Sequence, residues 1–172
     1  MLFGLEYFFP IMPELILLFG IFVTILVRLL AGKCCYEKVY WSSQLTLIIT
    51  LASLLFTAKF VSYGLVYSNL LEIDVFSFFV KALLVFGLGV IFCYGKNYVR
   101  ELKDNNGDYY LLALLSLLGM MILSSAANLL MVYLGVEIMS LPIYAMVALW
   151  RDESICVEAG LKYFITGALA SC

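Results

Sequence analysis

Glu137 is the acidic side chain that lies deepest within a long apolar stretch of this sequence. It is the tenth residue of the stretch 128–150, so ~13–14 Å of helix separates it from the first residue of that stretch. Burial at that depth favours the uncharged carboxyl unless a cation lies close, so a modest local change can load or release a proton. We therefore expect Glu137 to serve in a proton relay. The alternative is a neutral glutamate hydrogen-bonded to a neighbouring helix.

Two lysines also lie within apolar stretches. Lys81 is the seventh residue of the stretch 75–94, ~9–10 Å deep, and its long side chain could extend to the membrane surface. Lys162 lies at a similar depth in the stretch 157–172, and Glu158 precedes it by four residues, the spacing of a helical ion pair. Each lysine therefore either takes part in proton transfer or simply reaches the interface.

Pro142 adds a backbone feature beside Glu137. Proline has no N–H, so the carbonyl of Ile138, one residue after Glu137, loses its helical hydrogen-bond partner. A bent helix with a free carbonyl next to an acid can open a polar path through a membrane. The alternative is a kink that serves packing alone.

The amino-acid composition indicates the class of protein that contains these residues. Of the 172 residues, 65% are hydrophobic and 13% are charged, against ~45–50% and ~25% in soluble domains. The net charge of −2 and the absence of a basic tract exclude a nucleic-acid binder. There is no histidine, and the five cysteines show no C-x-x-C spacing, so we predict no metal site. These features indicate an integral membrane protein and exclude a soluble enzyme.

Six apolar stretches account for most of the chain. They cover residues 13–30, 40–58, 75–94, 109–125, 128–150 and 157–172. A helix needs roughly 17–25 apolar residues to span a bilayer, and the last stretch has 16. The runs are continuous, which favours helices over the alternating strands of a β-barrel. We therefore predict an all-α membrane protein with five complete transmembrane helices plus a partial sixth, forming a single membrane domain over residues 1–172.

The basic residues predict the orientation of these helices. They flank the first, third and fifth connections (Arg28, Lys33, Lys38, Lys96, Arg100, Lys103 and Arg151), and Lys59 flanks the second. Basic residues concentrate on the cytoplasmic side of membrane proteins, so we predict an N-terminus outside. Residues 1–10 match neither a secretory signal nor a transit peptide. We therefore expect a bacterial protein or one made inside an organelle.

Two segments carry a family resemblance: LGVEIMSLPIY at 134–144 and EAGLKYFITGALAS at 158–171. With them the chain resembles subunit 2 of the proton-pumping NADH:ubiquinone oxidoreductase, respiratory complex I, which is an antiporter-like membrane subunit. In that family the glutamate matched by Glu137 pairs with a lysine on a later, broken helix. Lys162 matches a lysine of the same hydrophilic axis, and Pro142 matches the proline after the glutamate.

The resemblance implies proton translocation coupled to quinone reduction elsewhere in the complex. It also implies that this chain binds no cofactor, because NADH, flavin, iron–sulfur clusters and ubiquinone are used by other subunits. The implied partners are lipids and other membrane subunits of complex I, with no nucleic acid. Family members contain many more helices, so we expect a second chain to complete the subunit. The richness in Phe and Tyr favours the mitochondrial inner membrane, with a bacterial plasma membrane as the alternative.

Two other functions remain open on the sequence alone. One is a subunit of a related cation/proton antiporter complex. The segment EAGLKYFITGALAS at 158–171 distinguishes the two, because it is more similar to subunit 2. The other is a structural membrane scaffold without pump activity. Replacement of Glu137 by Gln distinguishes a scaffold from a pump subunit, because a scaffold loses no proton-coupled activity.

Overall fold

The computed structural model describes residues 9–31, 36–60, 64–66, 70–101, 107–150 and 153–171. Within these residues, a short 3-10 helix, η1 (Phe9–Ile11), leads into the first of six α-helices. The α-helices are α2 (Met12–Ala31), α3 (Tyr36–Phe60), α4 (Val75–Glu101), α5 (Asp108–Ser124), α6 (Leu129–Val147) and α7 (Ser154–Ser171). Two short antiparallel strands, β1 (Gly64–Val66) and β2 (Leu71–Ile73), lie between α3 and α4.

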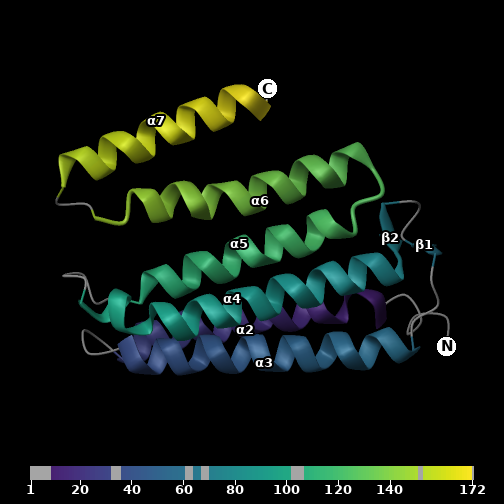
Figure 1. Ribbon diagram of the computed structural model, residues 1–172. Coiled ribbons are helices and arrows are strands. Elements are labelled where there is room, and N and C mark those ends of the chain that lie inside the picture. Colours follow the sequence, from purple (N-terminus) through teal and green to yellow (C-terminus); the bar gives the residue numbers. More distant parts are fainter. Residues whose placement is uncertain are drawn as a thin grey trace.

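Successive helices run antiparallel, so the bundle has two distinct ends (Figure 1). The hairpin end contains β1 and β2, together with the first residues of α2, α4 and α6. The opposite end, where α3, α5 and α7 begin, contains a cluster of tyrosines that includes Tyr36, Tyr40 and Tyr110. On the orientation predicted from the basic residues, the hairpin end faces outside.

Helices α4 and α6 begin at residues whose side chains satisfy free backbone N–H groups. At the start of α4, the Asp74 carboxylate accepts a hydrogen bond from Val75 N at 2.8 Å, and the Ser77 hydroxyl accepts one from Asp74 N at 3.1 Å. The side chain of Asn128 caps α6 by accepting from Leu130 N. Before α5, Gly107 adopts a φ of +70°, a conformation that glycine tolerates best.

The serine and threonine hydroxyls of α3 are satisfied within their own helix. Thr50 donates to the carbonyl of Thr46 at 2.7 Å, and Thr57 donates to that of Ser53 at 2.8 Å. An unpaired hydroxyl inside a membrane costs free energy, and a bond to the preceding turn avoids that cost. Threonines and serines can therefore occupy this long apolar helix.

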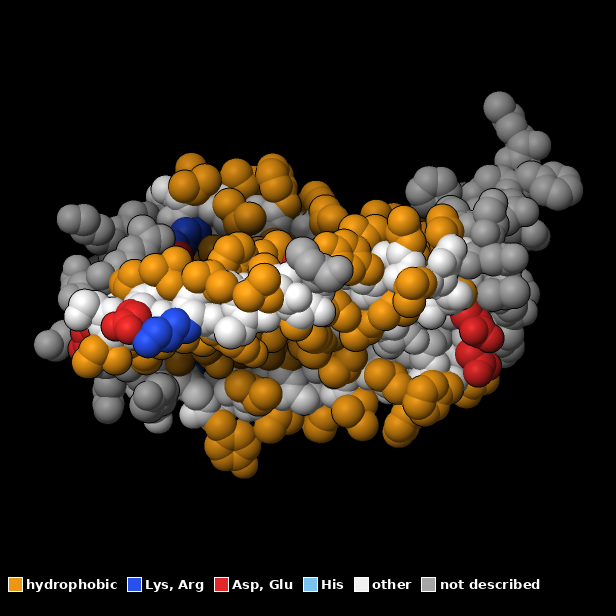
Figure 2. Space-filling view, turned by 90° about the horizontal axis from the view of Figure 1, so that it is seen from above, with side chains coloured by type: hydrophobic (Ala, Val, Ile, Leu, Met, Phe, Trp, Pro, Cys, Tyr) orange, Lys and Arg blue, Asp and Glu red, His pale blue; other side chains and the backbone are white. Residues whose placement is uncertain are grey.

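The helices are packed to very different degrees. α5 is the most enclosed, with eight buried residues, and it contacts α2, α3, α4 and α6. In α6 the buried residues are Gly135 and Pro142, and the other side chains are half-buried or exposed. Figure 2 shows a largely hydrophobic face of the bundle, with the visible charged side chains toward the two ends of the bundle. This is the distribution expected of a surface that contacts lipid or other membrane helices.

The predicted architecture is right in class but not in its exact count. Each apolar stretch lies largely within one helix, yet α6 ends at Val147 rather than Trp150, and α7 begins at Ser154 rather than Val157. In the described part of the chain, four helices (α2, α3, α4 and α6) are long and apolar enough to cross a membrane. α5 is apolar but has 17 residues, so five complete spans are not confirmed.

Candidate functional site

Glu137 lies near the middle of α6. It is the ninth residue of this 19-residue helix, ~12 Å along the axis from Leu129. Its side chain is half-buried, and its carboxylate makes no hydrogen bond or ion pair with any residue that the structure describes. The backbone carbonyl of Glu137 accepts a hydrogen bond from the Ser140 hydroxyl at 3.3 Å. The carboxyl is therefore positioned by a helix and remains available to a group outside the described residues.

The backbone beside Glu137 packs directly against α5. A Cβ atom built on Gly119 would lie 2.3 Å from Met139 N and 2.8 Å from the carbonyl carbon of Ile138. Pro142 is buried one turn further along the same helix. Because Pro142 cannot donate to the Ile138 carbonyl, that carbonyl group lies at the contact with α5 without its usual helical partner. α6 nevertheless continues as one helix through Pro142.

Lys162 is on the neighbouring helix but does not pair with Glu137. It is the ninth residue of α7, and its Nζ lies 2.6 Å from Glu158 Oε1, as the spacing of four residues predicted. The side chains of Lys162 and Glu158 are 74% and 66% exposed in the described chain. Lys162 is therefore paired locally at the surface of the bundle, near the middle of its helix.

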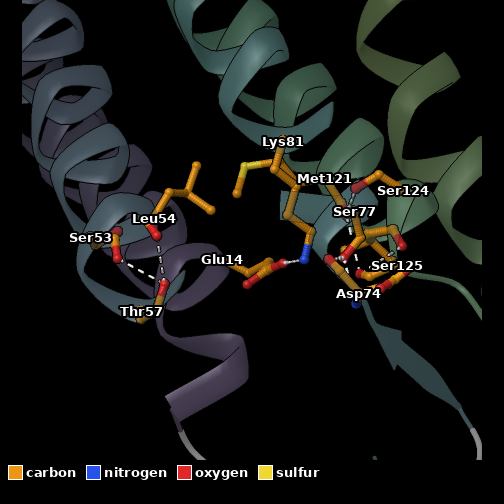
Figure 3. A network of polar contacts seen from close by, with 11 residues as sticks. Glu14, Ser53, Leu54, Thr57, Asp74, Ser77, Lys81, Met121, Ser124 and Ser125 are labelled. Atoms are coloured by element: carbon orange, nitrogen blue, oxygen red, sulfur yellow. Dashed lines mark hydrogen bonds and ion pairs between the residues drawn. The ribbon is translucent and has the colours of Figure 1, made fainter. Parts of the chain in front are cut away.

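Lys81 does not extend to the membrane surface, which was one of the two predictions made for it. Its side chain is 4% exposed, and its Nζ lies 2.6 Å from Glu14 Oε1 of α2. The Glu14 side chain is 12% exposed. Extension to the membrane surface is thus wrong for Lys81, because the ammonium group lies inside the bundle. Figure 3 shows this ion pair among side chains of α3, α4 and α5.

Glu14 is the ionisable residue that sequence reasoning missed. Glu14 and Lys81 are 67 residues apart, so no local spacing connects them. A weaker signal was available: the two have opposite charges, and both lie near the end of an apolar stretch that the predicted topology places at the same face of the membrane. Two opposite charges at matching depth in a bundle are expected to pair, because either one alone is expensive there.

A second ion pair joins two helices at the opposite end of the bundle. Arg28, in the last turn of α2, donates from Nε to Asp108 Oδ1 at 2.6 Å and from Nη2 to Asp108 Oδ2 at 3.0 Å. These side chains are 24% and 39% exposed, so water reaches both. Nearby, Tyr36 and Tyr110 share a hydrogen bond of 2.7 Å between their hydroxyls. This end is therefore fixed by exposed charge and by aromatic packing.

The fold and these residues define a polytopic helical membrane protein with ionisable groups inside its helices. Residues 126–172 match the family model described as NADH:quinone oxidoreductase/Mrp antiporter, TM. NADH-quinone oxidoreductase subunit N of Coxiella burnetii is 41% identical over 95% of this chain and 34% of its own length. Subunit N of Hydrogenovibrio crunogenus is 35% identical, also over 95% of this chain and 34% of its own length.

A solved structure agrees with the sequence comparisons. A chain of respiratory complex I from Thermus thermophilus with bound aureothin superposes with a TM-score of 0.71 and 29% identity, over 92% of this chain and 34% of that one. The protein is thus homologous to the antiporter-like subunit N, or subunit 2, of NADH-quinone oxidoreductase. It spans about one third of the length of these relatives. The relatives named above are bacterial, so they do not support the preference for a mitochondrial membrane.

Proposed function

We propose that this chain takes part in proton translocation by a membrane-embedded NADH-quinone oxidoreductase, and that Glu137 is its proton-exchanging carboxyl. One observation carries the proposal. Glu137 is half-buried in the middle of α6, and its carboxylate has no partner among the described residues. By contrast, Glu14, Asp108 and Glu158 each pair with a cation.

An unpaired carboxylate at that depth is too costly to remain charged alone. Glu137 is therefore either neutral or paired with a cation from a helix beyond the described chain. Movement or neutralisation of such a cation would make Glu137 take up a proton, and its return would release the proton. The relatives are about three times as long as this chain, and in our proposal the cation comes from the part of subunit N that this chain does not cover. The expectation that a second polypeptide provides that part stays a prediction.

Lys162 is the second residue that we assign to this path. It lies at the same position along α7 as Glu137 along α6, the ninth residue of each helix. Its ion pair with Glu158 holds the ammonium near mid-helix. Pro142 contributes the free carbonyl of Ile138 beside Glu137, a group that can accept a hydrogen bond from water.

The chemistry proposed for this chain is proton transfer without redox steps. NADH oxidation and quinone reduction belong to other subunits, and this chain itself would hold no flavin, iron–sulfur cluster or nucleotide. The partners that we propose are the other membrane subunits of the complex and surrounding lipids. The similarity to bacterial subunits supports placement in a bacterial plasma membrane.

The decisive experiment replaces Glu137 with Gln in the complete complex. The complex would be purified, reconstituted into liposomes and assayed for NADH oxidation, quinone reduction and acidification of the lumen. We expect the Glu137→Gln complex to assemble but to lose at least ~90% of its proton pumping, since general acid–base groups contribute 100-fold or more. Glu37→Gln is the matched control, because Glu37 is exposed in the first turn of α3.

A structural scaffold gives a different result. If the chain only holds its neighbours in place, the assembled Glu137→Gln complex pumps at the rate of the Glu37→Gln control. That outcome would remove the proposed role of Glu137.

A further inference from the structure

We propose that Glu14 and Lys81 form a second proton-exchanging site in this chain, buried near the hairpin end of the bundle. The proposal rests on the proposed role of the protein in proton translocation but not on Glu137. In the exchange, the N–H bond of the Lys81 ammonium breaks and an O–H bond forms on Glu14. The charged pair thereby becomes a neutral amine and a neutral carboxylic acid, and the reverse step restores both charges.

The first argument is the burial of the pair. Glu14 is the third residue of α2 and Lys81 the seventh of α4, and their charged groups lie 2.6 Å apart. Leu54 of α3 and Met121 of α5 lie beside them in Figure 3, and both are almost completely buried. At such a site water screens the charges poorly, so two charged groups are costly to keep there unless all of their polar atoms have partners.

The second argument is the incomplete hydrogen bonding of the pair. Glu14 Oε2 is buried and has no hydrogen-bond partner in the described chain. Lys81 Nζ, besides its contact with Glu14, lies 5.8 Å from the centre of the Phe78 ring. A buried ion pair stabilises a fold only when its remaining polar atoms are satisfied, and here one carboxylate oxygen is not. That oxygen remains able to accept a proton.

The third argument is a polar route to the surface. Asp74, Ser77 and Lys81 have the spacing i, i+3 and i+7, which places them along one face of α4. Asp74 is exposed at the start of the helix. The buried Ser77 hydroxyl donates a hydrogen bond to the backbone carbonyl of Asp74 at 2.7 Å. The buried Ser125 of α5 lies beside this row in Figure 3. Hydroxyl groups can both donate and accept, so this row supplies polar groups between the hairpin end and Lys81, and the proposed proton route passes along it.

Among the residues that the structure describes, few ionisable groups lie near the pair. From the described elements packed at this end they are Lys59 at the end of α3, Glu72 of β2 and Asp74, and all three are exposed. α5 presents Met121, Ser124 and Ser125 toward this region, and none of them ionises in the physiological range. Exposed charges are screened by water, so the proton balance of the buried pair is set mainly by its two members.

The test uses two variants of the complete complex in liposomes. Lys81→Arg keeps the positive charge and the pairing with Glu14, but Arg cannot release its proton. The double variant Glu14→Leu with Lys81→Met replaces the pair by apolar side chains of similar size, a change that proteins often tolerate without loss of stability. Asp108→Asn is the control, because it breaks the exposed ion pair at the other end of the bundle.

We expect both variants to assemble and to lose proton pumping ~10-fold or more, while the control pumps normally. Full pumping by either assembled variant would overturn the proposal and leave the pair a structural contact. Failure of both to assemble would likewise show a structural role. If Lys81→Arg stops pumping and Glu137→Gln does not, the role of Glu137 fails and that of the pair stands.

Discussion

Gly119 of α5 is in direct backbone contact with Met139 of α6, two residues after Glu137. A Cβ on Gly119 would lie 2.3 Å from Met139 N and 2.7 Å from Met139 Cα, closer than any real Cβ contact. Because these are backbone atoms, no rotation of a side chain can relieve the overlap. The position of the helix that carries Glu137 is therefore fixed by the lack of a side chain at Gly119.

Gly119→Ala should separate α5 from α6. Forcing one methyl group into a close-packed contact typically costs ~1–3 kcal/mol, which outweighs the ~0.5–1 kcal/mol that alanine gains over glycine within a helix. The expected result is a lower thermal midpoint of the full chain in detergent micelles. Gly89→Ala is the matched control, since nothing lies within 4 Å of a Cβ at that position of α4. Equal midpoints for the two variants would show that α5 and α6 are not held by this contact.

Lys162→Arg tests whether Lys162 must release its proton. Arginine can form the same pair with Glu158 four residues earlier, so assembly should be unchanged. Arginine remains charged under all physiological conditions, so a proton-transfer role predicts a loss of proton-coupled turnover. The measurement is NADH-driven acidification of liposomes that contain the complete complex. Turnover equal to that of the unmodified complex would instead mean that Lys162 only forms an ion pair with Glu158 on the surface of α7.

Asp108→Asn should weaken the connection between α2 and α5 only slightly. The Arg28–Asp108 pair has two hydrogen bonds, but both side chains are partly exposed, and exposed pairs contribute at most ~1 kcal/mol. The thermal midpoint should fall by a small amount at low salt, and the difference should shrink at high salt through screening. Glu37→Gln, an exposed acid of α3, serves as the control. A large loss that is independent of salt would indicate that this pair is effectively buried.

The helices could be predicted from the sequence because continuous apolar runs have few alternatives in a membrane. Their ends were less predictable. α3 begins at Tyr36, ahead of the apolar run that starts at Tyr40, and α4 continues to Glu101, beyond Tyr94. A helix needs apolar side chains only where hydrocarbon surrounds it, and its backbone can continue into polar sequence at either end.

The tertiary pairings were the part that the sequence did not yield. The pair of Glu158 and Lys162 was predicted because both lie on one helix, four residues apart. The pair of Glu14 and Lys81 depends on the packing of α2 near α4, which helix propensity and hydropathy do not encode. Glu137 differs from both, because its carboxylate pairs with none of the residues that this structure describes.

The contact between Gly20 of α2 and Thr46 of α3 predicts a loss of stability on substitution of Gly20 that a second substitution, at Thr46, should reduce. A Cβ on Gly20 would lie 1.6 Å from Thr46 Cγ2, 3.0 Å from its Cβ and 3.4 Å from its hydroxyl oxygen. Thr46 is buried, so its methyl group has little room to move. Gly20→Ala alone should therefore destabilise the full chain by ~1–3 kcal/mol, measured as a lower thermal midpoint in detergent micelles.

Thr46→Ser is the change that should relieve this clash. Serine keeps the hydroxyl that donates to the Ser42 carbonyl and removes only Cγ2, the atom closest to the added methyl group. In the Thr46→Ser background, Gly20→Ala should then cost less than it does alone, because the closest contact lengthens from 1.6 Å to 3.0 Å. Neighbouring residues that share a contact typically show coupling of ~0.5–3 kcal/mol in a double-mutant cycle, and we expect a value in that range. Strict additivity of the two changes would mean that α2 and α3 do not pack through this pair.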